Sequence, residues 1–483
     1  MLKVEEIKQL IENDALSDLK NRAKVGLRYY EAEHDILNYK MYYYNSDGQL
    51  VEDRTRANSR ICHPFFTELV DQLVAYMLSF EDNPIQAKEH ADGLQDYLDE
   101  YFDEEFWAEM QELLTGTNAK GFEYLYAYKN ADDRLAIKCA DSLGVVEVRA
   151  KETDDGCEYI IYWYVDRIGK DRKKIKRIEV YDKDQIWFYM QEDDGAIVID
   201  DNEEINPKPN IVWRDKVTGE YYGGKTLGFI PFWRLDNNKK QYSGLKPIKG
   251  LIDDYDLMEC GLSNNLQDFD QPIHLVKGFQ GDDLSELQQN IKTKKLLGVD
   301  ENGGLDILTV NVPYEARKVK ADEDEKNIYR YGMGFNSSQV GDGNITNVVI
   351  QSRYTLLNLK AHKLKTRLQR FLKEIIRVVI DEINQKHGKA YQYHDVLIKF
   401  EFITPVNEQE TAQIEKTRAE TKQIEINTIL NAATVIGDEE VLKAMCDILD
   451  LDYEELQKRL EEMNEEQNTA NAGALLDSIE PEE

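Results

Sequence analysis

The segment GFNSSQVGDGNITNVVIQSRYTLLNLKAHKLKTRLQRFLKEIIR, residues 334–377, joins a glycine- and asparagine-rich loop to the longest amphipathic pattern in the chain. Apolar residues recur at helical spacing from about residue 348 to 386, which predicts a helix of roughly 55 to 60 Å. In the loop before it, Gly341 and Gly343 bracket Asp342, and glycines at this density permit several backbone states. The apolar stripe of the helix consists of Leu357, Leu364, Leu368, Phe371, Leu372, Ile375, Ile376, Val379, Ile380 and Ile383.

The same helix is strongly basic. Between residues 347 and 377 it carries eight Lys and Arg residues and one acid, Glu374, in a chain whose formal net charge is −33. Two interpretations stay open. The cations face nucleic acid, or they neutralise either the acidic run at 81–105, which holds ten Asp and Glu against one Lys, or the acidic C-terminal tail. The residues proposed to lie near nucleic acid are Lys360, Lys363, Lys365, Arg367 and Arg370.

Composition limits the class of protein. The 483 residues are enough for roughly three folding units, and 41% of them are hydrophobic, so wholesale disorder is not expected. With 60 Lys and Arg against 93 Asp and Glu, a general nucleic-acid wrapper is disfavoured, because phosphate binding depends on cationic side chains.

Cysteine spacing and apolar runs indicate a cytoplasmic setting. Five cysteines without a CxxC pair fit neither a zinc ribbon nor a disulfide framework, so reduced thiols are expected. The first 26 residues carry early acids and a helical apolar period, which predicts a helix rather than a signal peptide. No run of 18 apolar residues without a charge occurs, so no membrane span is expected.

The other segments alternate between helix and sheet. Residues 1 to about 120 read as mainly helical, whereas the apolar period changes to two from 122 to 235, which predicts an antiparallel sheet region. LKPIKGLIDDYDLMECGLSNNLQDF, residues 245–269, predicts a second long helix of roughly 38 Å. Residues 272–313 predict a compact segment of strands around a short helix. The helix pattern of 314–334 is polar on nearly every face, so we expect neighbouring elements to support it.

The sharpest motif match is GxxxxGK[ST] at residues 219–226, ending in Lys225 and Thr226, the P-loop signature that cradles phosphates at a helix N-terminus. Its context is unfavourable, because Gly228 and Pro231 would break any helix within two turns. A hairpin turn is the favoured interpretation. A P-loop nucleotide hydrolase is kept as an alternative function.

No catalytic constellation stands out. The acids of IDDYD, residues 252–256, could in principle hold Mg²⁺, but Asp253 and Asp256 share a helix face while Asp254 points about 100° away, which favours a solvated face. The seven histidines form no HxxxH or HExxH pair, and no Ser or Cys lies in a GxSxG elbow. We therefore predict no catalytic residue, no bound metal, no cofactor and no enzymatic activity.

Taken in order, the segments resemble one family. The N-terminal helices and the sheet region end in LGFIPFWRLDNN, and the helix SGLKPIKGLIDDYDLMECGLSNNLQDF follows. Next come a small inserted segment, the return helix VPYEARKVKADEDEKNIYRYGMGF, the loop and long helix quoted above, and a strand closing in ITPVNEQE. This order is similar to that of the portal proteins of tailed bacteriophages, in the branch common in phages and prophages of Gram-positive hosts. NSRICHPFFTELVDQLVAYMLSF also resembles an early wing helix of that branch, and the resemblance covers about residues 57 to 465.

The resemblance implies an α+β, portal-type fold that assembles as a ring, usually of twelve subunits. In the C-terminal region the chain departs from the family pattern, because EINTILNAATVIGD stands where a proline-bearing turn is usual. The implied parts are a wing of N-terminal helices and antiparallel sheet at 1–243, a stem helix at 244–271, an α/β clip at 272–313, a second stem helix at 314–335, a tunnel loop at 336–347, a long wing helix and strand at 348–404, a helical crown at 405–466, and an acidic disordered tail at 467–483.

The implied function is a channel at one capsid vertex through which double-stranded DNA is packaged and ejected without sequence preference. The implied partners are other copies of the chain, the packaging ATPase (terminase large subunit), the major capsid and scaffolding proteins, and a head-completion adaptor, with no membrane. The protein would be assembled in the host cytoplasm and reside in the virion. The DNA-facing tunnel loop would comprise Gln339, Val340, Asp342, Asn344, Ile345, Thr346 and Asn347, and the motor-docking clip would use Asp282, Asp283, Glu286, Lys292, Lys294 and Lys295.

In that picture the first stem helix buries one stripe and leaves Lys249, Asp256, Ser263, Asn264 and Gln267 for the lumen or for neighbouring subunits. An acidic wall with few cations suits DNA that must slide, because it keeps the affinity for phosphate low. An acidic helical scaffold or adaptor protein without a channel is kept as a further alternative.

Overall fold

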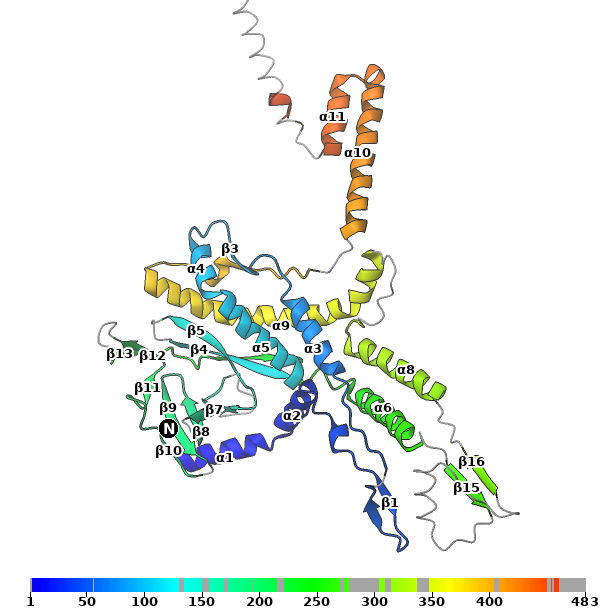
Figure 1. Cartoon of the computed structure of the whole chain (residues 1–483). Coiled ribbons are helices and arrows are strands. Elements are labelled where there is room, and N and C mark those ends of the chain that lie inside the picture. The colour runs from blue at the N-terminus through cyan, green and yellow to red at the C-terminus, as the bar shows by residue number, and fades with distance from the viewer. Residues whose placement is uncertain are drawn as a thin grey trace, which may run out of the picture. The chain divides into compact units, whose positions relative to one another are not determined.

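The computed structural model forms two units, and each is described here by itself. The first consists of Met1–Val340 with Arg353–Thr404, and the second of Gly341–Ser352 with Pro405–Glu483. The first unit mixes helices with antiparallel sheets, which confirms the α+β class (Figure 1). The structure describes residues 2–54, 56–129, 134–149, 156–168, 173–193, 195–214, 221–269, 273–277, 304–308, 314–336, 347–403, 408–449, 453 and 456–459.

Helices dominate the N-terminal part, as predicted. Ser17 caps the second of them by accepting a hydrogen bond from the Lys20 backbone N–H, a common way to satisfy the first turn. A β-hairpin in this region was not predicted. The helices are α1 (Val4–Ala15), α2 (Asp18–Tyr30), η1 (Asp35–Asn38), α3 (Phe65–Met77), α4 (Leu94–Tyr101) and α5 (Glu104–Lys120), and the hairpin is β1 (Tyr42–Tyr44) with β2 (Leu50–Glu52).

Antiparallel sheets fill the region from 122 to 236, which confirms the change of period. One sheet has the order β10-β9-β8-β7-β6, with β11 paired to β9; a second has the order β14-β4-β5, and β12 pairs with β13. The strands are β4 (Phe122–Lys129), β5 (Leu135–Ala140), β6 (Val145–Val148), β7 (Tyr159–Ile168), β8 (Lys173–Tyr181), β9 (Gln185–Glu192), β10 (Ile197–Ile199), β11 (Lys208–Pro209), β12 (Ile211–Arg214), β13 (Tyr221–Lys225) and β14 (Phe232–Asp236).

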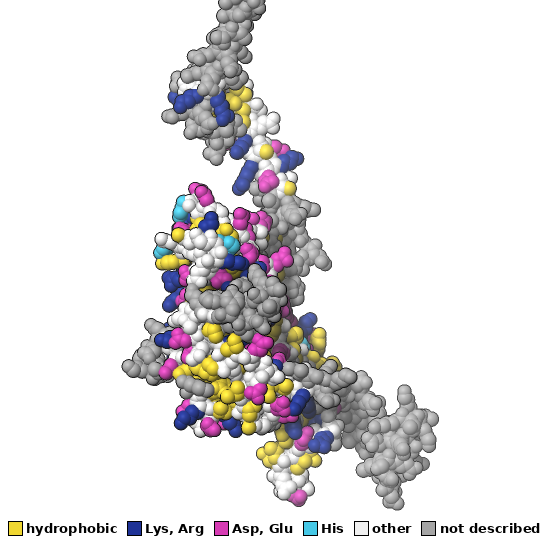
Figure 2. Space-filling model, turned by 90° about the vertical axis from the view of Figure 1, so that its left-hand side faces the viewer, with side chains coloured by type: hydrophobic (Ala, Val, Ile, Leu, Met, Phe, Trp, Pro, Cys, Tyr) yellow, Lys and Arg dark blue, Asp and Glu magenta, His cyan; other side chains and the backbone are white. Residues whose placement is uncertain are grey.

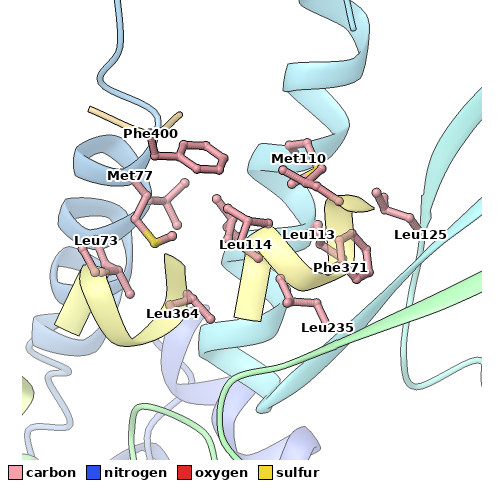
Figure 3. Packing of buried hydrophobic residues seen from close by; sticks show 14 of the residues in the cluster. Leu73, Met77, Met110, Leu113, Leu114, Leu125, Leu235, Leu364, Phe371 and Phe400 are labelled. Atoms are coloured by element: carbon pink, nitrogen blue, oxygen red, sulfur yellow. The ribbon is translucent and has the colours of Figure 1, made fainter. Parts of the chain in front are cut away.

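The long helix predicted from about 348 to 386 is α9 (Asn347–His387), with 41 residues. All ten residues of its predicted apolar stripe are buried. Figure 3 shows Leu364 and Phe371 of α9 lying among side chains of α3, α5, β4 and β14, so one helix joins the helical and sheet parts of the core. After α9 the chain returns through η3 (Tyr393–Asp395) to β17 (Val396–Ile398), which pairs with β3 (Ile85–Ala87).

Two helices flank the inserted segment. α6 (Lys249–Phe269) precedes it and α8 (Tyr314–Gly332) follows it, in agreement with the sequence pattern. Within the insertion, β15 (Ile273–Lys277) pairs with β16 (Gly304–Leu308) in antiparallel fashion. The rest of the insertion, including the expected short helix, lies outside the described residues.

The second unit contains α10 (Glu408–Ile436) and α11 (Asp438–Leu449). The stretch EINTILNAATVIGD, expected to depart from the family pattern, continues α10 as helix up to Ile436. Gly437 then adopts a left-handed backbone with φ of 91°, a conformation that favours glycine and ends the helix. The predicted acidic tail lies outside the described residues.

Candidate functional site

The helices α6 and α8 lie side by side in antiparallel register. Lys320 of α8 pairs with Asp254 of α6 at 2.6 Å, and Arg317, one turn earlier in α8, donates to the Met258 carbonyl, one turn later in α6. The backbone comes close at Gly261, where an added Cβ would lie 2.9 Å from the Arg317 guanidinium. Polar contacts therefore hold the first half of α8 to α6, whereas Ile328 and Tyr329 near its end are buried in the main hydrophobic cluster. Neighbouring elements support α8, as its polar pattern predicted.

The opposite end of α8 packs on α3. A Cβ at Gly332 would lie 2.6 Å from Leu69, and Tyr329 contacts Phe65 edge-to-face at 5.9 Å. Tyr329 also donates to Glu68 of α3 at 2.5 Å. Burial and this carboxylate neighbour raise the pKa of Tyr329 well above its usual value, so the phenol stays a donor.

An extended segment, Ala57–His63, runs along a second face of α6; we call it the strap. Its alternate backbone N–H groups donate to side chains four residues apart on the helix, with Ala57 bonded to Asp268, Ser59 to Asn264, Ile61 to Cys260 and His63 to Asp256. Two residues of extended chain rise about 6.6 Å and four residues of helix about 6.0 Å, so the two repeats match over this length.

A buried carboxylate, Asp256, anchors the last residue of the strap to α6. Asp256 has no exposed surface and accepts hydrogen bonds from His34 Nδ1 at 2.6 Å, His63 Nδ1 at 2.8 Å and the His63 backbone N–H at 3.0 Å. Burial alone would raise the pKa of Asp256, but the bonds from His34 and His63 outweigh it and hold the pKa below its usual range. Both imidazoles must carry their proton on Nδ1, because an ionised carboxylate only accepts.

These contacts overturn two expectations. Asp256 does not lie on a solvated face, and neither Asp256 nor Asn264 is available to a lumen, because both are buried beneath the strap. Asp253 instead bonds Tyr29 and Lys249, and Asp254 bonds Lys320. The sequence did contain a signal for the strap, since hydrogen-bonding side chains recur every four residues at Asp256, Cys260, Asn264 and Asp268. Of the other residues expected to face a lumen, Gln267 is exposed and donates to Ser59, Lys249 pairs with Asp35, and Ser263 is partly exposed.

The start of the predicted tunnel loop is clamped. The side-chain amide of Gln72 in α3 donates to the Phe335 carbonyl at 2.7 Å and accepts from the Phe335 N–H at 2.9 Å. Asn336 donates to Glu325 of α8 at 2.8 Å. Asn347 is the first residue of α9, while the other predicted loop residues, Gln339, Val340, Asp342, Asn344, Ile345 and Thr346, lie outside the described residues.

Two of the five predicted basic residues are engaged within the chain. The Lys360 ammonium donates to the Gly332 carbonyl at 3.0 Å, at the end of α8. Lys365 donates to the Phe400 carbonyl at 2.6 Å and lies 5.3 Å from the centre of the Phe402 ring.

Lys360 gives a prediction about pH. Burial lowers the pKa of Lys360 from 10.5 to about 8, so between these values the unfolded chain binds more protons and stability rises with pH. Because the Lys360 side chain is only partly buried, we expect Lys360→Met to stabilise the protein at pH 7 by no more than about 1 kcal/mol, after the lost hydrogen bond is subtracted, and to flatten the rise from pH 8 to 10. Thermal melts at several pH values measure this, with the exposed Lys363→Met as the control. A loss of stability at pH 7 would contradict the assignment.

The other three basic residues line a groove. Lys363, Arg367 and Arg370 lie on one face of α9, along a groove of about 950 Å³ bordered by β14. Arg234 on that strand is paired with Glu147 at 2.8 Å and Asp236 at 3.0 Å. Within the described part of the chain, no carboxylate pairs with the three helix cations. Two acids of the run at 81–105, Glu100 and Asp103, pair with Arg134, and no ion pair joins that run to α9 among the described residues, so neutralisation of the run by α9 is not supported.

The comparisons with known proteins bear on the whole arrangement. The family model "Phage portal protein, SPP1 Gp6-like" matches residues 11–470. The chain belongs to this phage portal protein family. The portal protein of Bacillus phage SPP1 is 25% identical over 350 residues, which cover 71% of this chain and 66%, just under two thirds, of that protein. The portal protein of Clostridium phage phiCD119 is 24% identical over 379 residues, 72% of this chain and 78% of the relative. The resemblance read from the order of segments is thus confirmed at the level of the family.

Other features of this portal-family chain bear on the alternatives. Gly224 and Lys225 lie in β13, paired with Val212 and Ile211 of β12, so the P-loop match ends in a strand and not at a helix N-terminus. This confirms the hairpin interpretation. Among the described residues, none of the helices combines the length and the hydrophobicity that a membrane span needs. The predicted docking residues of the insertion, Asp282, Asp283, Glu286, Lys292, Lys294 and Lys295, lie outside the described residues.

Proposed function

We propose that the chain forms a closed ring, usually of twelve copies in this family, at one capsid vertex of a phage. Double-stranded DNA would pass through its channel during packaging and ejection. The observation that carries this proposal is the family match over residues 11–470. The protein would be assembled in the host cytoplasm, would stay in the virion, and would contact the major capsid and scaffolding proteins there.

The helix pair α6–α8 is proposed as the stem around the channel. Its charge supports this role: α6 carries one cation and five acids, and α8 five of each. Several of the cations are already held by neighbours, because Lys249 and Lys320 are paired with aspartates and Arg317 is bonded to a carbonyl. A wall of this kind binds phosphate weakly, so DNA can slide past it.

The loop 336–347 is proposed to close around the DNA. The clamp at its start supports this, because Gln72 and Glu325 fix Phe335 and Asn336 at the end of α8. The groove cations Lys363, Arg367 and Arg370 are proposed as a separate place of contact with the DNA backbone, where bonding would be independent of sequence.

The insertion between α6 and α8 is proposed as the clip that docks the packaging ATPase, the terminase large subunit, and later the head-completion adaptor. Its two described strands pair with each other; β15 comes shortly after α6 and β16 shortly before α8, as expected for a unit held at the end of a stalk. Of the alternatives, the P-loop hydrolase is disfavoured by the strand at Lys225, and a scaffold without a channel would not need this helix, insertion, helix order.

The channel and the clip are tested in a phage whose own portal gene is replaced by the gene for this chain or its variants, with packaged DNA as the readout for the channel and motor binding for the clip. Exchanging residues 339–345 for a Gly-Ser linker should leave rings intact and lower the amount of DNA packaged per particle. An unchanged amount of packaged DNA would show that the loop is only a connector.

Reversing Asp282, Asp283 and Glu286 to Lys should leave rings and procapsids normal but slow motor binding at low salt, because charges at the rim of an interface tune association rates. Motor binding at the wild-type rate would show that these clip residues are not part of the docking surface.

A further inference from the structure

The hairpin β1–β2, which we call the arm, has a turn held by hydrogen bonds. Asn45 organises its turn: the side-chain oxygen accepts the Asp47 and Gln49 N–H groups at 3.1 and 2.8 Å, and Gly48 adopts a φ of 73°. Tyr44 lies opposite Leu50, and Tyr43 opposite Val51. The arm, residues 42–52, therefore has a definite conformation.

Hydrogen bonds join the strap to the chain just before the arm. Arg60 donates to the Leu37 carbonyl at 3.2 Å, and Asn58 donates to the Tyr39 carbonyl at 3.3 Å. Because this end of the strap is bonded to Asn264 and Asp268, the arm is rooted beside the C-terminal half of α6. Figure 1 shows it projecting alongside α6.

Both faces of the arm are open and apolar. The exposed fractions are 54% for Tyr42, 48% for Tyr43, 73% for Tyr44, 58% for Leu50 and 37% for Val51. Figure 2 shows hydrophobic side chains gathered on this projecting part of the surface. Summed over the two faces, they expose roughly 500 Å² of side chain, and exposed aromatic and apolar area of this extent is typical of interaction sites. A lone two-stranded hairpin is only marginally stable in water, so a partner that covers the arm is expected.

The chemistry of the arm points to a protein partner. Two of its nearby cations are paired, since Lys40 and Arg54 both contact Glu52 at 3.5 Å, and the neighbouring Asp47 and Asp53 would repel phosphate. Tyrosines, by contrast, are enriched in the buried centres of protein interfaces.

We infer that the arm packs against the helix pair α6–α8 of a neighbouring copy. This inference rests on the proposed ring. Rotation about the channel axis relates the copies, so a given part of the chain lies at the same position along the axis in every copy. The arm is rooted beside the C-terminal half of α6, and it therefore meets the C-terminal half of α6 and the start of α8 on the next copy. In that part of the pair the exposed apolar side chains are Leu266, Tyr314 and Val319, with exposed fractions of 57, 51 and 57%. Each copy thus carries two different patches, the arrangement that closes into a ring.

The first test compares two triple variants by mass photometry over a concentration series. Tyr42→Ser, Tyr44→Ser and Leu50→Ser remove one face of the arm, whereas Val165→Ser, Val198→Ser and Ile199→Ser remove apolar residues of the sheet that are about half exposed. We expect the arm variant to need at least tenfold more protein to assemble, with the unassembled chains of all forms melting alike. Wild-type assembly by the arm variant would overturn the inference and leave the ring intact. A wild-type chain that never assembles would overturn both.

The second test does not depend on a destabilising change. Tyr44→benzoylphenylalanine places a photo-crosslinker at the tip of the arm in an otherwise wild-type chain. We expect irradiation of assembled protein to give a covalent dimer whose linked peptide lies within 249–332 of the second chain. A crosslink elsewhere in the partner, or only within one chain, would overturn the assignment of the receiving surface.

Discussion

Asp256→Ala is expected to destabilise the protein by about 3 to 5 kcal/mol, because it removes the acceptor of three hydrogen bonds in a site without solvent. His34 and the His63 backbone N–H would be left unbonded, and the strap would lose its attachment to the N-terminal half of α6. Thermal melts measure the stability. Tryptic cleavage after Arg60 reports the strap itself, and we expect it to become faster.

The matched control is Asp268→Ala, twelve residues later on the same face. Asp268 is exposed and accepts one N–H, from Ala57 at 3.0 Å, so its removal should cost no more than about 1 kcal/mol. Equal and small losses in the two variants would show that Asp256 is not the anchor of the strap. Equal cleavage rates after Arg60 would show the same.

Gly26→Ala is expected to cost about 2 to 3 kcal/mol, although Gly to Ala inside a helix normally stabilises. Gly26 faces α5, and an added Cβ would collide with the Ala119 carbonyl oxygen and lie 2.9 Å from Ser243 Oγ. The neighbouring Gly244 N–H bonds the Asn118 carbonyl at 2.9 Å, so this contact also holds the chain just before α6. Loss of stability should therefore be accompanied by weaker ring assembly.

Gly250→Ala provides the control with the opposite sign. Gly250 is helical, lies in α6, and has no atom within 4 Å of an added Cβ, so the substitution should stabilise by up to about 1 kcal/mol. Chemical denaturation of both variants decides the matter. If Gly26→Ala also stabilised, the close approach of α2 and α5 would be wrong.

Sequence patterns predicted the elements whose cause is local. The stripe of α9 repeats at helical spacing, and the Tyr- and Ile-rich strands of 122–236 alternate, so both could be read directly from the chain. The strap could not. Its backbone N–H groups are bonded by side chains of α6, about 200 residues later, and the sequence of Ala57–His63 does not identify α6 as the partner.

The role of Asp256 shows the same limit. Helical geometry correctly placed Asp253 and Asp256 toward one side and Asp254 toward another, but which side is buried depends on what covers the helix. For α8, the polar pattern predicted supporting neighbours without naming α6 and α3. The family, in contrast, could be recognised from the order of the segments, because that order does not depend on any one contact.

The proposed ring is the central claim, and electron microscopy of the purified chain tests it most directly. At micromolar protein across a salt series, the account predicts closed rings with an axial hole and a mass that is a whole multiple of the 56.1 kDa chain, near twelvefold. A particle that stays at 56.1 kDa throughout the series, with no ring in any image, would contradict it.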